Sequence, residues 1–148
     1  MVFSLAALLV VAADRFSKLW IRSYSEGQLI FEAGFFRLTH IRNTGAAFGL
    51  FQGQSFLLAI ASIIGIVVIL LLVFSVSRRF PFLDTMPDKL ALGLVLGGTI
   101  GNLVDRLRFG YVTDFISIGI WPTFNIADSA VTVGVILFAF FFSSSTRA

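Results

Sequence analysis

Hydrophobic segments long enough to cross a lipid bilayer alternate with short polar segments along most of the chain. A helix needs about 20 mostly apolar residues to span a hydrocarbon core about 30 Å thick. Residues 56–76 contain no charged residue, residues 127–142 contain one acid, and residues 90–104 are shorter and end at a charged pair. These three segments, together with a first segment from Met1 to about Ile21, predict four transmembrane helices with both termini on one side.

The segment between the first two predicted helices has a different character. Residues 25–55 are rich in phenylalanine and glycine, and residues 35–41 have a strand-like composition. Because their period-2 alternation is poor, we predict a small extended or β-like element on the membrane surface. The predicted fold is therefore an all-α membrane protein with this one β-like element, and residues 1–148 form a single domain. Glycines at 93, 97 and 101 predict close helix packing in the third segment.

Composition supports a membrane protein and excludes several other classes. The chain is 57% hydrophobic and 13% charged, whereas soluble domains are about half apolar and about a quarter charged. The lysines and arginines are scattered, so the net charge of +3 does not indicate nucleic-acid binding. The absence of cysteine excludes disulfides and thiolate metal sites. Basic residues fall on both sides of the predicted helices, so the positive-inside rule does not decide orientation; they include Arg22, Arg37, Arg42 and Arg108 on one side and Arg78, Arg79, Lys89 and Arg147 on the other.

Half of the eight acidic residues lie within or beside apolar segments. A charge at a helix centre costs about 2.5–3.5 kcal/mol on insertion scales, so an intramembrane acid is a functional hypothesis. Asp14 precedes Lys18 by four residues, the spacing of a helical ion pair. Asp105 adjoins Arg106, which favours a structural pair there as well. The other acids are expected in loops: Glu26, Glu32, Asp84 and Asp88.

Asp114 and Asp128 differ, because neither has a basic residue within four positions along the chain. Asp114 follows the third helix in a short re-entrant or surface stretch, and Asp128 lies near the start of the fourth helix. If the two carboxyls converge, poor solvation and like charge make them share one proton. Such a pair suits acid–base hydrolysis. Proton or cation translocation and plain helix pairing stay open at this point.

Other catalytic chemistries fit the sequence less well. The single histidine, His40, lies in the first loop without a recognisable motif, and no H-E-x-x-H zinc motif, P-loop or dinucleotide fingerprint is present. We therefore expect neither a metal nor a cofactor.

Five motifs in order along the chain resemble those of the bacterial lipoprotein signal peptidases, or signal peptidase II. They are DRFSK at 14–18, RNTGAAFG at 42–49, GGTIGNLVDR at 97–106, VTDFI at 112–116 and FNIADSA at 124–130. The resemblance implies an aspartic endopeptidase that removes the signal peptide from diacylglyceryl-modified prolipoproteins, cutting before the lipidated cysteine. It implies that Asp114 and Asp128 are the catalytic pair.

The same resemblance implies supporting roles for further polar positions: Asp14, Lys18, Asn43, Gly45, Asn102, Asp105, Arg106 and Asn125. It implies a multi-pass protein of the bacterial inner membrane, with cytoplasmic termini and the dyad toward the periplasmic side. The first motif departs from the family's usual D-Q-x-T-K, which leaves the role of that helix face open. The expected partners are the prolipoprotein and membrane lipid, with no nucleic acid, and we expect a monomer. The alternatives are a small proton- or cation-coupled carrier and a structural assembly factor.

Overall fold

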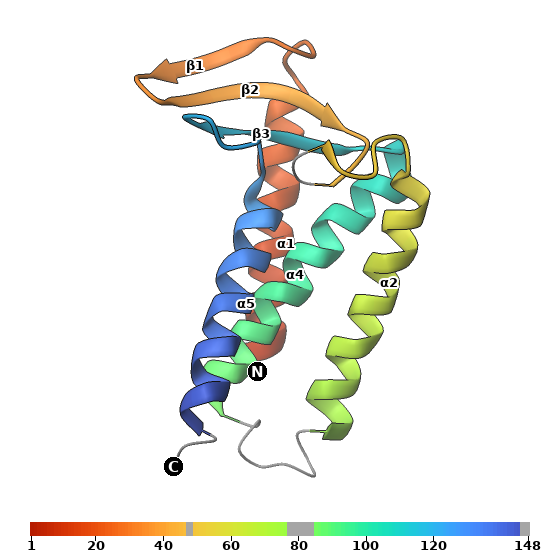
Figure 1. Ribbon diagram of the computed structural model, residues 1–148, viewed down its shortest axis with the longest axis vertical. Helices are drawn as coiled ribbons and strands as arrows, with labels where there is room; N and C mark the ends of the chain where they lie inside the picture. The colour runs from red at the N-terminus through yellow and green to blue at the C-terminus, as the bar shows by residue number, and fades with distance from the viewer. Residues whose placement is uncertain (47–48, 77–84, 146–148) are drawn as a thin grey trace.

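The computed structural model describes residues 1–46, 49–76 and 85–145. A bundle of long helices carries a small antiparallel sheet at one end, and α1 begins and α5 ends at the opposite end (Figure 1). The helices are α1 (Val2–Ile21), α2 (Ser55–Leu71) with a π-helical continuation η2 (Leu72–Val76), α4 (Met86–Phe109) and α5 (Ile126–Ser145). The strands are β1 (Leu29–Ala33), β2 (Phe36–Asn43) and β3 (Val112–Ile118).

Three helices of the described residues are long and apolar enough to cross a membrane: Ser55–Ser75, Met86–Phe109 and Ile126–Ser143. Helix α1 has 20 residues but carries Asp14, Arg15 and Lys18, and it is not among the three. The chain is thus a mostly helical membrane protein. All four predicted helical segments are helices, although α1 does not have the composition of a span that faces lipid.

Helix α4 is longer than the sequence predicted and passes through the charged residues that were expected to end it. Its first turn is capped by Thr85, whose hydroxyl accepts from Asp88 N–H. It ends at Gly110, which adopts the left-handed conformation with φ of 76°. Asp105 and Arg106 therefore lie in the last turns of a continuous helix, where they face other elements of the protein.

Helix α4 forms the centre of the bundle because its glycines let two neighbouring helices approach closely. A Cβ at Gly97 would lie 2.7 Å from the Ala7 carbonyl oxygen of α1, and one at Gly93 would lie 2.6 Å from the Phe3 carbonyl oxygen. Gly134 of α5 packs as closely against the Ala91 carbonyl oxygen of α4, at 2.7 Å. The predicted close packing of small residues is confirmed.

The sheet differs from the prediction in one strand. Its order is β1-β2-β3, with both pairs antiparallel. The predicted β-like element between the first two helices is present as β1 and β2. The segment around Asp114 was predicted as a re-entrant or surface stretch without regular structure, whereas Val112–Ile118 is a strand paired with β2. The protein is therefore not all-α.

Two acids that were expected in loops lie in regular elements. Asp88 occupies the first turn of α4 and is 1% exposed, and Glu32 lies in β1. The hydroxyl of Thr85 donates to Asp88 Oδ2, so Asp88 belongs to the cap of α4. Asp84, Arg78, Arg79 and Arg147 lie outside the described residues.

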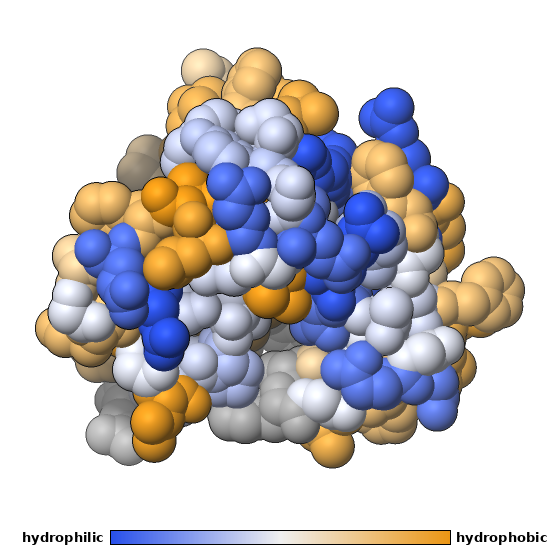
Figure 2. Space-filling model, turned by 90° about the horizontal axis from the view of Figure 1, so that it is seen from above, coloured by the Kyte–Doolittle hydropathy of each residue, from blue (hydrophilic) through white to orange (hydrophobic). Residues whose placement is uncertain are grey.

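Viewed from the sheet end, hydrophilic residues gather on this face and hydrophobic residues lie mostly around its edge (Figure 2). Large apolar side chains on or beside the strands are exposed, among them Phe31, Phe35 and Trp121. Aromatic side chains of this kind are typical of the interface between membrane and water. The composition thus fits the predicted position of the sheet on the membrane surface.

Candidate active site

Asp114 lies in β3 and is 2% exposed, yet both of its carboxylate oxygens have a donor. Asn43 Nδ2 donates to Oδ2 over 2.9 Å, and Asn125 Nδ2 donates to Oδ1 over 2.7 Å. The pairing of β2 with β3 places Asn43 opposite Val112 and Ile41 opposite Asp114. The sheet therefore brings the amide of Asn43 from the first loop to a carboxylate 71 residues later.

Asp128 lies in the first turn of α5 and shares its environment with Asn125, the residue before the helix. Asp128 N–H donates to Asn125 Oδ1 over 2.9 Å, and Asn125 N–H donates to Asp128 Oδ2 over 3.2 Å. This is the reciprocal arrangement of a capping box. Asn125 lies just before Ile126, where α5 begins.

Asn102 connects the two acids to a buried lysine. Its Nδ2 donates to Asp128 Oδ1 over 2.7 Å, and its Oδ1 accepts from Asn125 Nδ2 over 3.1 Å and from Lys18 Nζ over 2.9 Å. The three asparagines Asn43, Asn102 and Asn125 thus supply amide donors to Asp114 or Asp128. Amides at these positions fix both carboxylates without adding charge.

Lys18 has no exposed surface, and three acceptors surround its ammonium group. Nζ lies 2.8 Å from Asp14 Oδ2 and 3.3 Å from Asp105 Oδ2, besides its bond to Asn102. The predicted ion pair of Asp14 with Lys18 is confirmed. Asp14 also accepts from Ala127 N–H over 3.1 Å, so α1 binds the beginning of α5. A carboxylate at that helix N-terminus is electrostatically favourable.

The expected pair of Asp105 with Arg106 is wrong. Among the described residues, the cations within ion-pair distance of Asp105 are Arg15 at 2.6 Å, Lys18 and Arg22 at 2.5 Å. Arg106 follows on the next helical position, 100° away around the axis, and therefore cannot share this contact. It turns instead toward the loop after β2, where Nη2 lies 3.4 Å from the Gly45 carbonyl oxygen.

Arg15 and Arg22 also belong to this network, although neither was predicted there. Arg15 follows Asp14 directly in the DRFSK motif, and Arg22 was read as a loop charge at the end of the first helix. Both donate to Asp105, which is fully buried. Spacing along α1 gave a signal: positions 15, 18 and 22 follow the helical repeat and predict one face with three cations.

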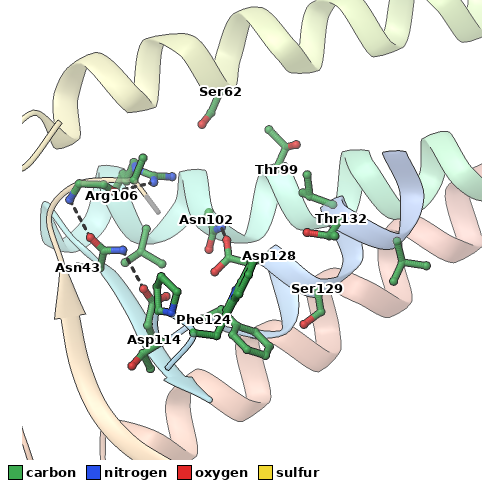
Figure 3. Close-up of a pocket in the computed structure, with 18 residues that line it drawn as sticks. Asn43, Ser62, Thr99, Asn102, Arg106, Asp114, Phe124, Asp128, Ser129 and Thr132 are labelled. Atoms are coloured by element: carbon green, nitrogen blue, oxygen red, sulfur yellow. Dashed lines mark hydrogen bonds between the residues drawn. The ribbon is translucent and has the colours of Figure 1, made fainter. Parts of the chain in front are cut away.

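A cavity of about 680 Å³ lies over the two acids. Figure 3 shows the carboxylates of Asp114 and Asp128 among the side chains that line it, with Asn43, Asn102 and Arg106 nearby. The rest of the lining is largely hydroxyl-bearing or apolar and comes from three helices, the loop after β2, strand β3 and the segment before α5: Gly45, Ala46, Ser62, Thr99, Val112, Trp121, Pro122, Thr123, Phe124, Ser129, Val131, Thr132 and Val133. Asp14, Lys18 and Asp105 lie behind the asparagines and do not line it.

Gly45 lies at the edge of the cavity, and its position explains why it is glycine. A Cβ there would lie 2.5 Å from the Leu50 carbonyl oxygen and 3.1 Å from the Gln52 nitrogen. The crowding comes from the loop's own backbone, which Ala46 N–H joins to Leu50 O over 2.7 Å. The contact that requires glycine here is therefore one within the loop itself. The loop residues Ala47 and Phe48 of the same motif lie outside the described residues.

The two acids differ in their electrostatic surroundings. Burial and the nearby charge of Asp128 raise the pKa of the Asp114 carboxyl to about 7, against the hydrogen bonds from Asn43 and Asn125. Asp128 lies instead at a helix N-terminus, where the backbone dipoles favour an anion. The carboxyl of Asp114 therefore titrates near neutral pH. No group of three or more His, Cys, Asp or Glu side chains able to hold a metal occurs among residues 1–46, 49–76 and 85–145.

The apolar helices, the sheet at one end and the cavity over two acids fit the class of membrane enzymes, and solved structures agree. One described as a bacterial membrane enzyme superimposes with a TM-score of 0.84 at 32% identity, covering 96% of this chain and 87% of the other. The family described as signal peptidase (SPase) II matches residues 6–143. The chain belongs to the signal peptidase II family of peptidases.

Curated relatives carry the same family name. A lipoprotein signal peptidase of Dehalococcoides mccartyi is 50% identical over 137 residues, which cover 92% of this chain and 85% of the relative. A lipoprotein signal peptidase of Moorella thermoacetica is 42% identical over 139 residues, covering 93% of this chain and 89% of the relative. The resemblance read from the five motifs is confirmed, and the carrier alternative has no support from these comparisons.

Proposed function

We propose that this protein removes the signal peptide from diacylglyceryl-modified prolipoproteins by aspartic hydrolysis, cutting before the lipidated cysteine. The observation that carries the proposal is the pair Asp114 and Asp128, whose carboxylates line one cavity and accept hydrogen bonds from asparagine side-chain amides. Membership of the signal peptidase II family supplies the substrate class.

The proposed reaction uses Asp128 as the base and Asp114 as the acid. Asp128 takes a proton from water, the water oxygen attacks the scissile carbonyl carbon, and Asp114 gives its proton to the carbonyl oxygen. The tetrahedral gem-diol then loses the cysteine nitrogen as the C–N bond breaks. Asp128 protonates that nitrogen, and a gem-diol hydroxyl returns a proton to Asp114. Both carboxyls end in their starting states, so water is the only co-reactant.

The neighbouring groups hold this pair ready for the reaction. Asn125 binds both acids, Asn102 joins Asp128 to Lys18, and Asn43 binds Asp114 from the sheet. Hydrogen-bond donors that are fixed before the substrate binds do not have to reorganise during the reaction. We assign these asparagines the role of orienting the dyad.

The substrate backbone is proposed to cross the site at Asp114. A second hollow of about 180 Å³ shares Asn43, Ala46, Asp114, Pro122 and Thr123 with the main cavity and continues toward Arg42 and Gln52. A peptide that passes from one hollow to the other brings a peptide bond over the carboxylate. Gly45 and Arg106 border this path, which supports a role in binding the substrate backbone.

For the whole protein, we propose one peptidase domain over residues 1–148 with four transmembrane helices, α1 included. Helix α1 covers α4, and its charged residues face the protein interior, since Asp14 and Lys18 are fully buried. A span with this arrangement keeps its charges out of lipid. The protein lies in the inner membrane as a monomer, with the sheet on the periplasmic side and the termini in the cytoplasm.

The proposal is tested with purified protein and a lipidated prolipoprotein in detergent, followed by mass spectrometry. Cleavage releases the signal peptide and leaves a fragment whose N-terminal residue is the lipidated cysteine. The same precursor without its diacylglyceryl group is the matched control and stays uncut. Because the mechanism needs only water, the reaction proceeds after exhaustive EDTA treatment. A precursor of unchanged mass, or activity that a divalent ion must restore, contradicts the proposal.

A further inference from the structure

We propose that Arg22 is a positioning residue for Asp114, which it orients through Thr113 and Asp105. The inference rests on the proposed function, since it concerns the geometry of the proposed acid. It assigns a role to an arginine at the end of α1 that neither lines the cavity nor contacts either catalytic acid in the described residues.

Arg22 connects the end of α1 to the beginning of β3. Its Nε donates to Thr113 Oγ1 over 2.9 Å, and its Nη2 donates to Asp105 Oδ1 over 2.5 Å. The guanidinium carbon lies 4.3 Å from the centre of the Phe109 ring. A guanidinium is a planar, rigid donor, so contacts on two edges and one face fix its orientation.

Thr113 is held both at its hydroxyl, which accepts from Arg22, and at its backbone N–H, and it has no exposed surface. Its hydroxyl binds Arg22, and its backbone N–H donates to Asp105 Oδ2 over 3.1 Å. Successive side chains of a strand point to opposite faces. Holding Thr113 against the helices therefore directs the next residue, Asp114, toward the cavity.

The sheet alone constrains Asp114 less firmly than a regular ladder does. Leu38 pairs with Ile116 and Ile41 pairs with Asp114. Between these two pairs β2 contains one residue more than β3, so the register shifts there. The irregularity lies directly beside Asp114, and a bulge of this kind leaves a residue unpaired and disrupts the ladder. The contacts of Thr113 with Arg22 and Asp105 supply the constraint on the preceding side of the acid.

Arg15 provides an internal comparison for Arg22. Both donate to the same oxygen, Asp105 Oδ1, at 2.6 Å and 2.5 Å, and their side chains are 18% and 14% exposed. Only Arg22 also binds Thr113 in the described residues. Loss of either arginine weakens the charge balance at Asp105, whereas loss of Arg22 also frees the strand at Asp114.

The experiment compares Arg22→Gln, Arg15→Gln, Thr113→Val, Thr113→Ser and the double variant Arg22→Gln/Thr113→Val. Turnover of a lipidated prolipoprotein peptide gives kcat and KM, and thermal unfolding gives Tm on the same samples. Misplacing a catalytic group by about 1 Å costs up to about 100-fold, and we expect Arg22→Gln and Thr113→Val each to lower kcat about 10-fold with KM nearly unchanged. Thr113→Ser keeps the hydroxyl and retains most of the activity.

Two further comparisons separate positioning from general stability. We expect Arg15→Gln to lower Tm about as much as Arg22→Gln does. It should lower kcat by less than about 3-fold, because it does not misplace Asp114. The double variant is no slower than the slower single variant, because both changes break one connection. Arg37→Gln, which removes an exposed pair with Glu32 at 4.0 Å, is the surface control with unchanged kcat.

Equal losses of kcat in Arg15→Gln and Arg22→Gln would overturn the inference, as would a double variant whose loss is the product of the two single losses. If Arg22→Gln does not fold, Thr113→Val against Thr113→Ser decides, and equal activity of these two variants refutes the connection. Asp114→Asn on the same substrate tests the proposed function itself, separately from the role of Arg22. A wild-type protein that cleaves while Arg22→Gln and Thr113→Val keep full kcat overturns this inference alone, whereas a wild-type protein that never cleaves overturns the proposed function.

Discussion

Asn125 and Asp128 bind each other reciprocally at the beginning of α5, each backbone N–H donating to the other's side chain. The same Asn125 also donates from its side-chain amide to Asp114. Asn125 therefore caps α5, which carries Asp128, and also binds β3, which carries Asp114. The distance between the two carboxylates depends on the capping of a helix.

Two substitutions at Asn125 separate these roles. Asn125→Ala loses the cap and the amide, and replacing a capping residue by alanine costs about 0.5–2 kcal/mol. Asn125→Ser keeps a good capping oxygen but loses the donor to Asp114. We expect Asn125→Ala to lower both Tm and kcat, and Asn125→Ser to lower kcat by a similar factor, about 10-fold or more, while Tm stays near that of the wild type. Equal kcat for wild type and Asn125→Ser would refute the orienting role.

Asp105→Asn tests the buried ion cluster. The change leaves Lys18, Arg15 and Arg22 with an excess of buried or partly buried positive charge, and breaking a buried pair typically costs about 3–5 kcal/mol. We expect a large fall in Tm, measured by thermal unfolding in detergent, together with a loss of activity. Glu32→Gln removes the exposed pair with Arg37 and serves as the control, with a change near zero. A Tm equal in both variants would contradict the cluster's structural role.

Gly45→Ala tests the loop at the edge of the cavity. The added methyl would lie 2.5 Å from the Leu50 carbonyl oxygen, so the loop must shift. Because Gly45 N–H donates to Asn43 Oδ1, this shift also displaces Asn43, which borders the proposed substrate path. We expect kcat/KM for a lipidated peptide to fall about 10-fold. Gly65→Ala on α2 is the control, because its Cβ meets nothing within 4 Å. Unchanged kcat and KM in Gly45→Ala would exclude a tight loop as a requirement for turnover.

The raised pKa of Asp114 predicts how stability depends on pH. Its folded pKa of about 7 lies above the ordinary value of 3.8, so between these values the folded protein binds the proton and the unfolded chain does not. The wild type therefore loses stability from this group as pH rises from about 4 to 7. Asp114→Asn lacks this loss, so its Tm advantage over the wild type grows through that window and levels off above it. A Tm difference that is constant from pH 4 to 8 contradicts the shift.

The helices and one buried ion pair were predictable from the sequence because the signal is local. Long apolar segments predicted the helical segments, and the spacing of Asp14 and Lys18 predicted their ion pair. The glycines of α4 predicted close packing. The identity of the polar residues near the dyad came from the family motifs and not from spacing.

Strand β3 and the true partners of Asp105 were not predictable in the same way, because both depend on contacts between distant segments. Residues 112–118 show no clear alternation, since Val112, Thr113, Asp114 and Phe115 are all buried although successive side chains point to opposite faces of the strand. Asp105 adjoins Arg106 along the chain, but neighbouring side chains of a helix point in different directions. Asp105 instead faces α1 and its end, where Arg15 and Arg22 bind it.

The central claim is that Asp114 and Asp128 cycle protons, and asparagine tests it because it keeps the volume and the hydrogen bonding but not the proton transfer. The most direct measurement is the turnover of a lipidated prolipoprotein by Asp114→Asn and Asp128→Asn, with binding and Tm recorded on the same folded samples. We expect each variant still to bind the substrate and to cleave it at least about 100-fold more slowly than the wild type. Near-normal turnover by either variant would contradict the aspartic mechanism.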